Sequence, residues 1–176
     1  MMKRYLSLLM AASLLLAGCG GRSLGNKIDD QFLAPRVSTE ITRSHADLND
    51  TTSNVTVVSY NGVILLAGQT PRAELRQLAE QVAHGVQGVR RVHNELQVTT
   101  PSSALARSSD ALLTTRIKTA MLADNTVPGS RIKVVTENGN VFLMGLVTRA
   151  EAQRATQVVQ GVGGVQRIVR LFEFTD

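Results

Sequence analysis

The amino-acid sequence predicts an α+β protein built from two tandem copies of one small domain, each with two helices packed on a three-stranded mixed sheet. Three observations predict this fold. One sequence unit occurs twice at an offset of 77 residues, each copy has two β-rich runs followed by an amphipathic helix, and each copy ends in a further β-rich run. The order in each copy is therefore helix, strand, strand, helix, strand.

The first 18 residues have the layout of an export signal. Lys3 and Arg4 precede an apolar run over residues 5–16, which is shorter than the roughly 20 residues that span a bilayer. The run ends in Leu16-Ala17-Gly18-Cys19, which resembles the lipobox of bacterial lipoproteins. That resemblance implies cleavage after residue 18, a lipidated Cys19, and a tether over residues 19–27.

Cys19 is the sole cysteine, so no disulfide forms within one chain. The residue after it is Gly20. In enteric-type bacteria an aspartate at this position holds lipoproteins at the inner membrane. We therefore expect a lipid anchor in the outer membrane, on its periplasmic face.

The repeat is colinear over most of the mature chain. Six residues of the first copy recur 77 positions later; they are Val57, Val58, Asn61, Gly62, Leu66 and Gly68, matching Val134, Val135, Asn138, Gly139, Leu143 and Gly145. Upstream, Asp30, Leu33, Arg36 and Thr39 match Asp110, Leu113, Arg116 and Thr119 at an offset of 80.

Strands are predicted where β-rich runs flank a turn signal. Asn61-Gly62 and Asn138-Gly139 are two-residue hairpin signals, because asparagine and glycine tolerate positive φ. The expected strands are 55–60, 63–67 and 91–98 in the first copy and 132–136, 141–144 and 166–174 in the second.

The second helix of each copy is amphipathic. One face carries Leu75, Leu78, Ala79, Val82 and Val86 in the first copy, and Ala152, Ala155, Val158, Val159 and Val162 in the second. Thr70-Pro71 is expected to begin the first of these helices, with the proline at its first position. Thr148 and Glu151 have the spacing of a capping box for the second.

The opening helices are expected to differ. In the second copy Asp110 is expected to cap a helix; its shared apolar face comprises Leu112, Leu113, Ile117, Ala120 and Met121. In the first copy Pro35 is tolerated only in a first turn, which predicts a short helix beginning near Pro35. Residues 100–107 are either a linker or a packed crossover.

The hairpin, the long helix and a Gly-Val-x-x-Val signature before the last strand resemble the BON domain of bacterial envelope proteins. Residues 88–92 and 164–168 carry that signature. The resemblance covers residues 28–99 and 108–176, and a lipobox before two such domains resembles the dual-BON outer-membrane lipoproteins. It implies a non-enzymatic role in binding anionic phospholipid and supporting outer-membrane integrity. It places the lipid surface around the first helix of the second domain, where Leu112 replaces a tryptophan of the family.

Charge also separates the two copies. Residues 28–100 hold six basic and eight acidic side chains, whereas residues 107–176 hold nine basic and six acidic ones. The second copy is therefore the better candidate for an anionic surface. The candidate lipid-binding residues are Arg107, Leu112, Leu113, Arg116, Lys118, Arg131 and Lys133. The alternative is that both leucines lie in the core and the charges form a solvated face.

Other classes of function are disfavoured. The aromatic residues form no stacking series among basic residues, which argues against nucleic acid. His45, His84 and His93 lack partners at metal-ligand spacing, and no nucleophile–base or phosphate-binding motif occurs, so no metal, cofactor or enzyme activity is expected. The alternative function is a protein-interaction adaptor for an outer-membrane assembly or secretion complex.

Overall fold

The computed structural model describes residues 24–176, with side chains from Asp29 onward. The predicted signal peptide and Cys19 lie outside the described residues. The first domain contains α2 (Leu24–Ser44), a short 3-10 helix η1 (Ala46–Leu48), β1 (Asn54–Tyr60), β2 (Val63–Thr70), α3 (Ala73–Gly85) and β3 (Arg91–Val98). The second contains α4 (Ala104–Ala123), η2 (Gly129–Arg131), β4 (Ile132–Glu137), β5 (Asn140–Val147), α5 (Arg149–Gln160) and β6 (Arg167–Phe174).

Each domain has the predicted mixed sheet of three strands. The orders are β1-β2-β3 and β4-β5-β6, in which the hairpin pair is antiparallel and the last strand is parallel to the middle one. The register repeats with the sequence, since Val57 pairs with Leu66 and Val134 with Leu143. The predicted αββαβ order is confirmed in both copies.

The two hairpins turn at the predicted residues. Asn61 and Gly62 have φ values of 54° and 73°, and Asn138 and Gly139 have 49° and 73°. These are the left-handed angles that a two-residue hairpin of this type requires. The prediction that both positions adopt positive φ is confirmed.

Asp110 does not cap α4, which corrects the prediction. The helix begins earlier, and its cap is Ser103, whose side chain accepts a hydrogen bond from the Ala106 N–H. Asp110 is 8% exposed and its carboxylate accepts hydrogen bonds from the N–H groups of Asn138 and Gly139, at 2.7 and 2.9 Å. The aspartate thus joins the helix to the hairpin turn, and the predicted linker is helical from Ala104 onward.

α2 is longer than predicted, because Pro35 lies inside it rather than at its start. Proline in a helix interior removes one backbone hydrogen bond and costs about 3 kcal/mol. Tertiary contacts before the proline offset that cost. Leu33 is 5% exposed in the core, and Asp30 accepts hydrogen bonds from the N–H groups of Asn61 and Gly62 at 2.6 and 2.9 Å.

The second helix of each domain begins differently. The predicted Thr148–Glu151 capping box is present on α5. α3 corrects the other prediction: its cap is Arg72, which makes no side-chain capping bond, because Thr70 still belongs to β2 and pairs with Val98. The predicted apolar faces of both helices pack into the domain cores.

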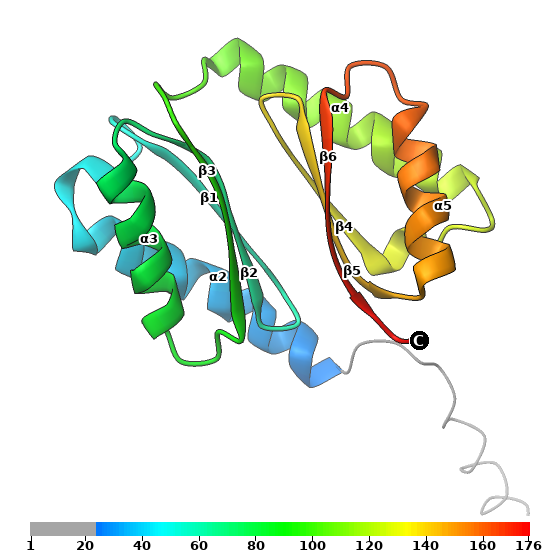
Figure 1. Cartoon of the computed structure of the whole chain (residues 1–176), viewed down its shortest axis with the longest axis horizontal. Helices are drawn as coiled ribbons and strands as arrows, with labels where there is room; N and C mark the ends of the chain where they lie inside the picture. Colours follow the sequence, from blue (N-terminus) through cyan, green and yellow to red (C-terminus); the bar gives the residue numbers. More distant parts are fainter. Residues whose placement is uncertain (1–23) are drawn as a thin grey trace, which may run out of the picture.

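The two sheets pack face to face, so the molecule has the layers helices, sheet, sheet, helices (Figure 1). The inner layer is one apolar cluster drawn from both domains; it comprises Tyr60, Val63, Leu65, Ala67, Phe142 and Met144. The opposite faces of β2 and β5 pack against the helices of their own domains. Both middle strands are therefore buried on both faces, a feature that was not predicted from the sequence.

Side chains at equivalent positions of the two copies each form hydrogen bonds to the other domain across this interface. The Tyr60 hydroxyl donates to the Arg131 carbonyl at 2.9 Å and accepts from the Leu146 N–H at 3.2 Å. Glu137, 77 residues after Tyr60, accepts from the Thr56 hydroxyl at 2.7 Å and the Asn54 amide at 3.3 Å. The interface thus has an approximate two-fold relation. Burial raises the pKa of Glu137 despite these hydrogen bonds.

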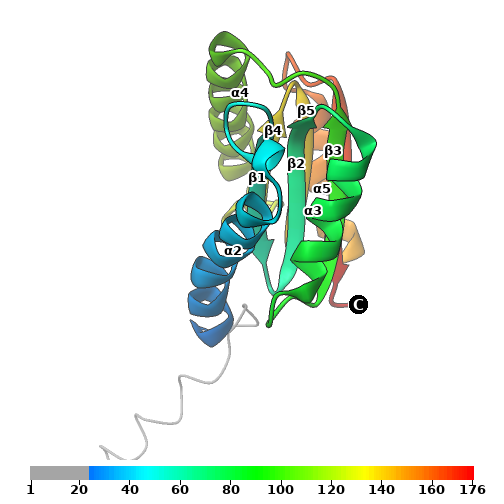
Figure 2. The same cartoon turned by 90° about the vertical axis from the view of Figure 1, so that its left-hand side faces the viewer.

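Ion pairs border the other side of the interface. Arg90 pairs with Glu173 at 3.3 Å, and Arg167 pairs with Glu95 at 3.2 Å. β3 therefore faces β6, while the Thr56–Glu137 bond shows that β1 faces β4. α2 packs over β1 and α4 over β4, and both helices lie on the same side of the molecule in Figure 2.

Candidate lipid-binding surface

α4 carries three large apolar side chains that are exposed to solvent. Leu105 is 78% exposed, and Leu112 and Leu122 are each 66% exposed. They are three of the six exposed large hydrophobic side chains in the described part of the chain. Leu105 and Leu112 are seven residues apart, which is close to two helical turns, so they lie on one face.

The cations on this helix are also exposed. Arg107, Arg116 and Lys118 face solvent, and the sole carboxylate of α4, Asp110, is buried at the hairpin turn. Arg107 donates to the Ser102 carbonyl at 2.6 Å, which is a neutral partner, and no ion pair is found for it among the side chains from Asp29 onward. We call these three cations together with Leu105, Leu112 and Leu122 the α4 surface.

Leu113 is not part of the α4 surface, which corrects the prediction for that residue. It is 4% exposed and packs in the domain core with Ile117 and Met121. Adjacent helical residues point about 100° apart, so Leu112 faces solvent when Leu113 faces the core. The predicted shared face therefore holds for Leu113, Ile117 and Met121 but is wrong for Leu112.

Arg131 and Lys133 lie on η2 and β4 rather than on α4. Arg131 forms an ion pair with Glu151 of the α5 capping box. Hydrogen bonding to the Thr148 N–H, followed by the Arg131 charge, lowers the pKa of Glu151 against its desolvation. The Lys133 ammonium donates to the Ser59 carbonyl of β1 at 3.3 Å. Both residues thus contact other parts of the fold.

The histidines have structural surroundings. His45 accepts a hydrogen bond from the Asp47 N–H at the start of η1. His93 lies on β3, where burial and then the Arg91 charge lower its pKa. Within residues 24–176, no group of three or more acidic, histidine or cysteine side chains has the arrangement of a metal site. No helix in that range is long and apolar enough to cross a bilayer.

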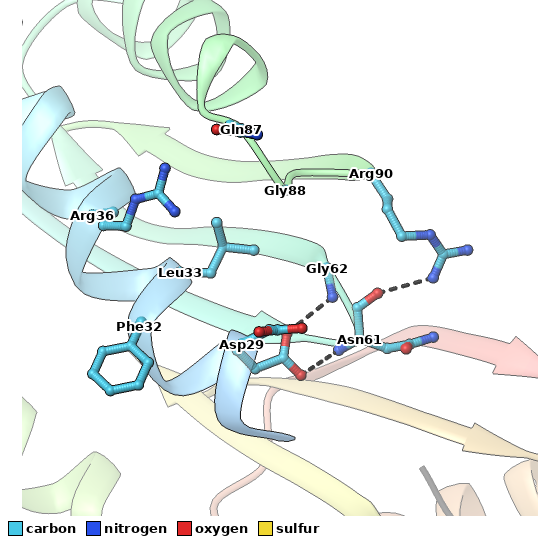
Figure 3. A pocket seen from close by; sticks show the side chains of 10 residues that line it. Asp29, Phe32, Leu33, Arg36, Asn61, Gly62, Gln87, Gly88 and Arg90 are labelled. Atoms are coloured by element: carbon cyan, nitrogen blue, oxygen red, sulfur yellow. Dashed lines mark hydrogen bonds between the residues drawn. The ribbon is translucent and has the colours of Figure 1, made fainter. Parts of the chain in front are cut away.

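A second exposed apolar surface, which was not predicted from the sequence, lies on the first domain. Phe32 on α2 is 63% exposed and lies at the rim of a cavity of about 760 Å³ (Figure 3). The cavity lies between α2, the Asn61–Gly62 turn and the segment that follows α3. The repeat contained the signal, because the offset of 80 that relates Asp30 to Asp110 also relates Phe32 to Leu112.

The sequence profile of the BON domain family matches residues 29–100 and 109–176. The chain is 35% identical to the outer membrane lipoprotein DolP of Haemophilus influenzae, covering 98% of this chain and 97% of that protein. It is 35% identical to a 21 kDa hemolysin of Actinobacillus pleuropneumoniae, covering 87% and 78% of the two chains. It is 30% identical to osmotically-inducible protein Y of Escherichia coli, covering 82% and 72%.

Proposed function

This chain belongs to the BON domain family and is an outer-membrane lipoprotein; from that premise we propose that it binds anionic phospholipid through the α4 surface of its second domain. In this proposal the acyl groups are carried by Cys19, the role is non-enzymatic, and lipid binding supports the integrity of the outer membrane. The proposal depends on one observation above all: α4 exposes leucines on a helix whose solvent-facing charges are all positive.

The physical chemistry of the α4 surface suits a lipid interface. Inserting a leucine side chain into an apolar environment contributes about 1.5–3 kcal/mol. Each cation close to an anionic surface contributes about 1 kcal/mol. A helix lying in the interface plane can use both contributions at once, since leucine reaches the acyl region and arginine or lysine stays at the head groups.

Vesicle flotation tests the proposal. A soluble form lacking residues 1–19 should float with phosphatidylglycerol vesicles and much less with phosphatidylcholine vesicles, and added salt should weaken the binding. Leu112→Ser should reduce affinity about tenfold, which corresponds to about 1.4 kcal/mol. Val98→Ser is the matched control, because Val98 is also exposed, at 47%, but lies on β3 of the other domain.

The charge contribution is measured in the same way. Arg116→Ser should reduce affinity about fivefold for a contribution near 1 kcal/mol, whereas Arg154→Ser on α5 should not. Equal binding to both kinds of vesicle, or none at low salt, would contradict the proposal. Crosslinking from position 112 to a protein, without vesicle binding, would indicate the adaptor function instead.

A further inference from the structure

We infer that the first domain carries a second phospholipid contact, formed by Phe32 and Arg36 of α2 beside the cavity at the Asn61–Gly62 turn. The inference rests on the proposed function, because it takes the occupant to be the leaflet that holds the acylated chain. It concerns different residues, however, and a different domain. The cavity beside Phe32 and the position of α2 in the chain lead to it.

The repeat places the same local architecture around Phe32 and Leu112. Leu33 and its equivalent Leu113 are both buried, and each lies next to a glycine of positive φ. A Cβ atom added at Gly88 would lie 3.6 Å from a Leu33 methyl group, and one added at Gly164 would lie 3.7 Å from a Leu113 methyl group. The neighbouring residue of each copy, Phe32 or Leu112, is then turned outward. Both domains therefore present one large apolar side chain at the same structural position.

The first domain adds a cavity that can receive a head group. Figure 3 shows the Arg36 and Arg90 side chains on two sides of the cavity, with Leu33 between them and Phe32 at the rim. Arg36 is exposed, and no ion pair is found for it among the side chains from Asp29 onward. Arg90, by contrast, donates to the Asn61 carbonyl at 2.9 Å and pairs with Glu173, so Arg36 is the cation we assign to the head group.

The acidic residues of the cavity are not equivalent. Asp30 is 7% exposed, and its carboxylate accepts from the N–H groups of Asn61 and Gly62 and from the Ser59 hydroxyl. These three hydrogen bonds hold the Asp30 carboxylate against the hairpin turn. Asp29 also lines the cavity, and its carboxylate repels an anionic head group. The contact is therefore expected to be too weak to recruit the free domain, which has an excess of acidic residues.

Because the acyl anchor already holds the chain at the membrane, a weak contact is sufficient to keep the first domain on the leaflet. Cys19 is five residues before Leu24, and five extended residues span at most about 18 Å. From Leu24 to Phe32 the helix rises about 12 Å. Phe32 is therefore held within about 30 Å of the acylated residue, where its effective concentration at the leaflet is high. Because α2 and α4 lie on the same side of the molecule (Figure 2), a leaflet approaching from that side meets both helices.

The absence of tryptophan from the sequence provides the test. Phe32→Trp, Leu112→Trp and Val98→Trp each introduce a single tryptophan into the mature acylated protein, reconstituted in phosphatidylethanolamine vesicles containing phosphatidylglycerol and excited selectively at tryptophan. Val98 is the control, since it pairs with the last residue of β2, at the end of the sheet opposite the Asn61–Gly62 turn. Emission is then measured with brominated lipids, which quench tryptophan on contact with the acyl region.

The inference predicts strong quenching and a blue shift for Phe32→Trp, with little change for Val98→Trp. Adding Arg36→Glu should reduce the quenching at position 32, whereas Arg154→Glu should not. Quenching at position 112 but not at 32 would overturn the inference and leave the proposed function standing. Quenching at 32 but not at 112 would support the first-domain contact and contradict the α4 site. Circular dichroism confirms that each variant is folded.

Discussion

Removing the Tyr60 hydroxyl is the sharpest test of how the two domains are joined. Tyr60 is 8% exposed, and its hydroxyl lies between the Arg131 carbonyl and the Leu146 N–H. The β4–β5 ladder pairs Ile132 with Gly145, so these two backbone groups stand just beyond its last pair. Tyr60→Phe keeps the ring in the inner apolar cluster and removes the partner of both groups.

The expected loss follows from those two bonds. Each contributes about 1 kcal/mol net, and a buried backbone group left without a partner costs about 1–3 kcal/mol. We therefore expect Tyr60→Phe to lower the free energy of unfolding by about 2–3 kcal/mol. For a cooperative unit of this size, 1 kcal/mol changes Tm by about 2–4 °C. Thermal and urea unfolding of the soluble form, followed by circular dichroism, should show a decrease in Tm of about 4–12 °C.

A matched control removes a hydroxyl elsewhere. Thr115→Val deletes an exposed hydroxyl that donates to the Ala111 carbonyl of its own helix, and should change stability by less than about 0.5 kcal/mol. If Tyr60→Phe changed stability no more than this control, the bridging role of the hydroxyl would be refuted. Two separate transitions in the unmodified protein would show that the domains unfold independently, contrary to the continuous inner layer.

Two further predictions concern the same interface. Burial raises the pKa of Glu137 above its ordinary value of 4.5, so the protonated carboxyl contributes stability that is present below pH 4.5 and is lost as the pH rises through the raised pKa. Glu137→Gln should remove this pH dependence, measured by urea titrations at pH about 4 and about 7. An unchanged pH dependence in the variant would contradict the assignment to Glu137. Gly68→Ala should destabilise the first domain by several kcal/mol, of order 3 or more, because φ is +116° and a Cβ would lie 1.9 Å from the Asn54 carbonyl oxygen. At the equivalent Gly145 the nearest atom is 3.1 Å away, so Gly145→Ala should cost clearly less in the same unfolding assay, and equal losses would refute the distinction.

The sequence predicted the elements of this fold well because local signals and tertiary contacts agree there. The Asn-Gly turns, the apolar faces of α3 and α5 and the order of the strands all follow from patterns of a few residues. The face-to-face packing of the sheets was also encoded but not recognised. Residues 63–67 are apolar without alternation, and such a run is typical of a strand that is buried on both faces.

The starts of the opening helices could not be predicted from local signals. Pro35 and Asp110 have strong positional preferences near helix starts, yet both lie inside helices. In each domain the aspartate carboxylate satisfies two backbone N–H groups of a turn about 30 residues away. A contact at that separation leaves no mark in the helical sequence itself, so the capping interpretation was the natural one and was wrong.

The candidate site was predictable at the level of the helix but not of the residue. Charge counts pointed to the second domain, where α4 presents Arg107, Arg116 and Lys118 to solvent. Which of Leu112 and Leu113 faces solvent depends on how α4 is rotated about its own axis against the sheet. That rotation is set by Asp110, which is directed to the hairpin turn, together with the buried residues Leu113, Ile117 and Met121.

Duplication also constrains where this protein can contact anything else. In an isolated BON-like unit the inner face of the sheet would be free, but here each inner face covers the other, and the cluster around Phe142 and Leu65 closes it. The remaining surfaces are the outer helices, the loops and the strand edges. Among the described residues, four of the six exposed large apolar side chains lie on the first helix of a domain, with Leu105, Leu112 and Leu122 on α4 and Phe32 on α2, whereas Val98 and Phe174 lie at the ends of β3 and β6. Fusion of the two copies has thus left the opening helices as the principal apolar surfaces for an external partner. An interface made by both helices would respond to changes at Tyr60 or Glu137, because those residues help set the angle between the domains.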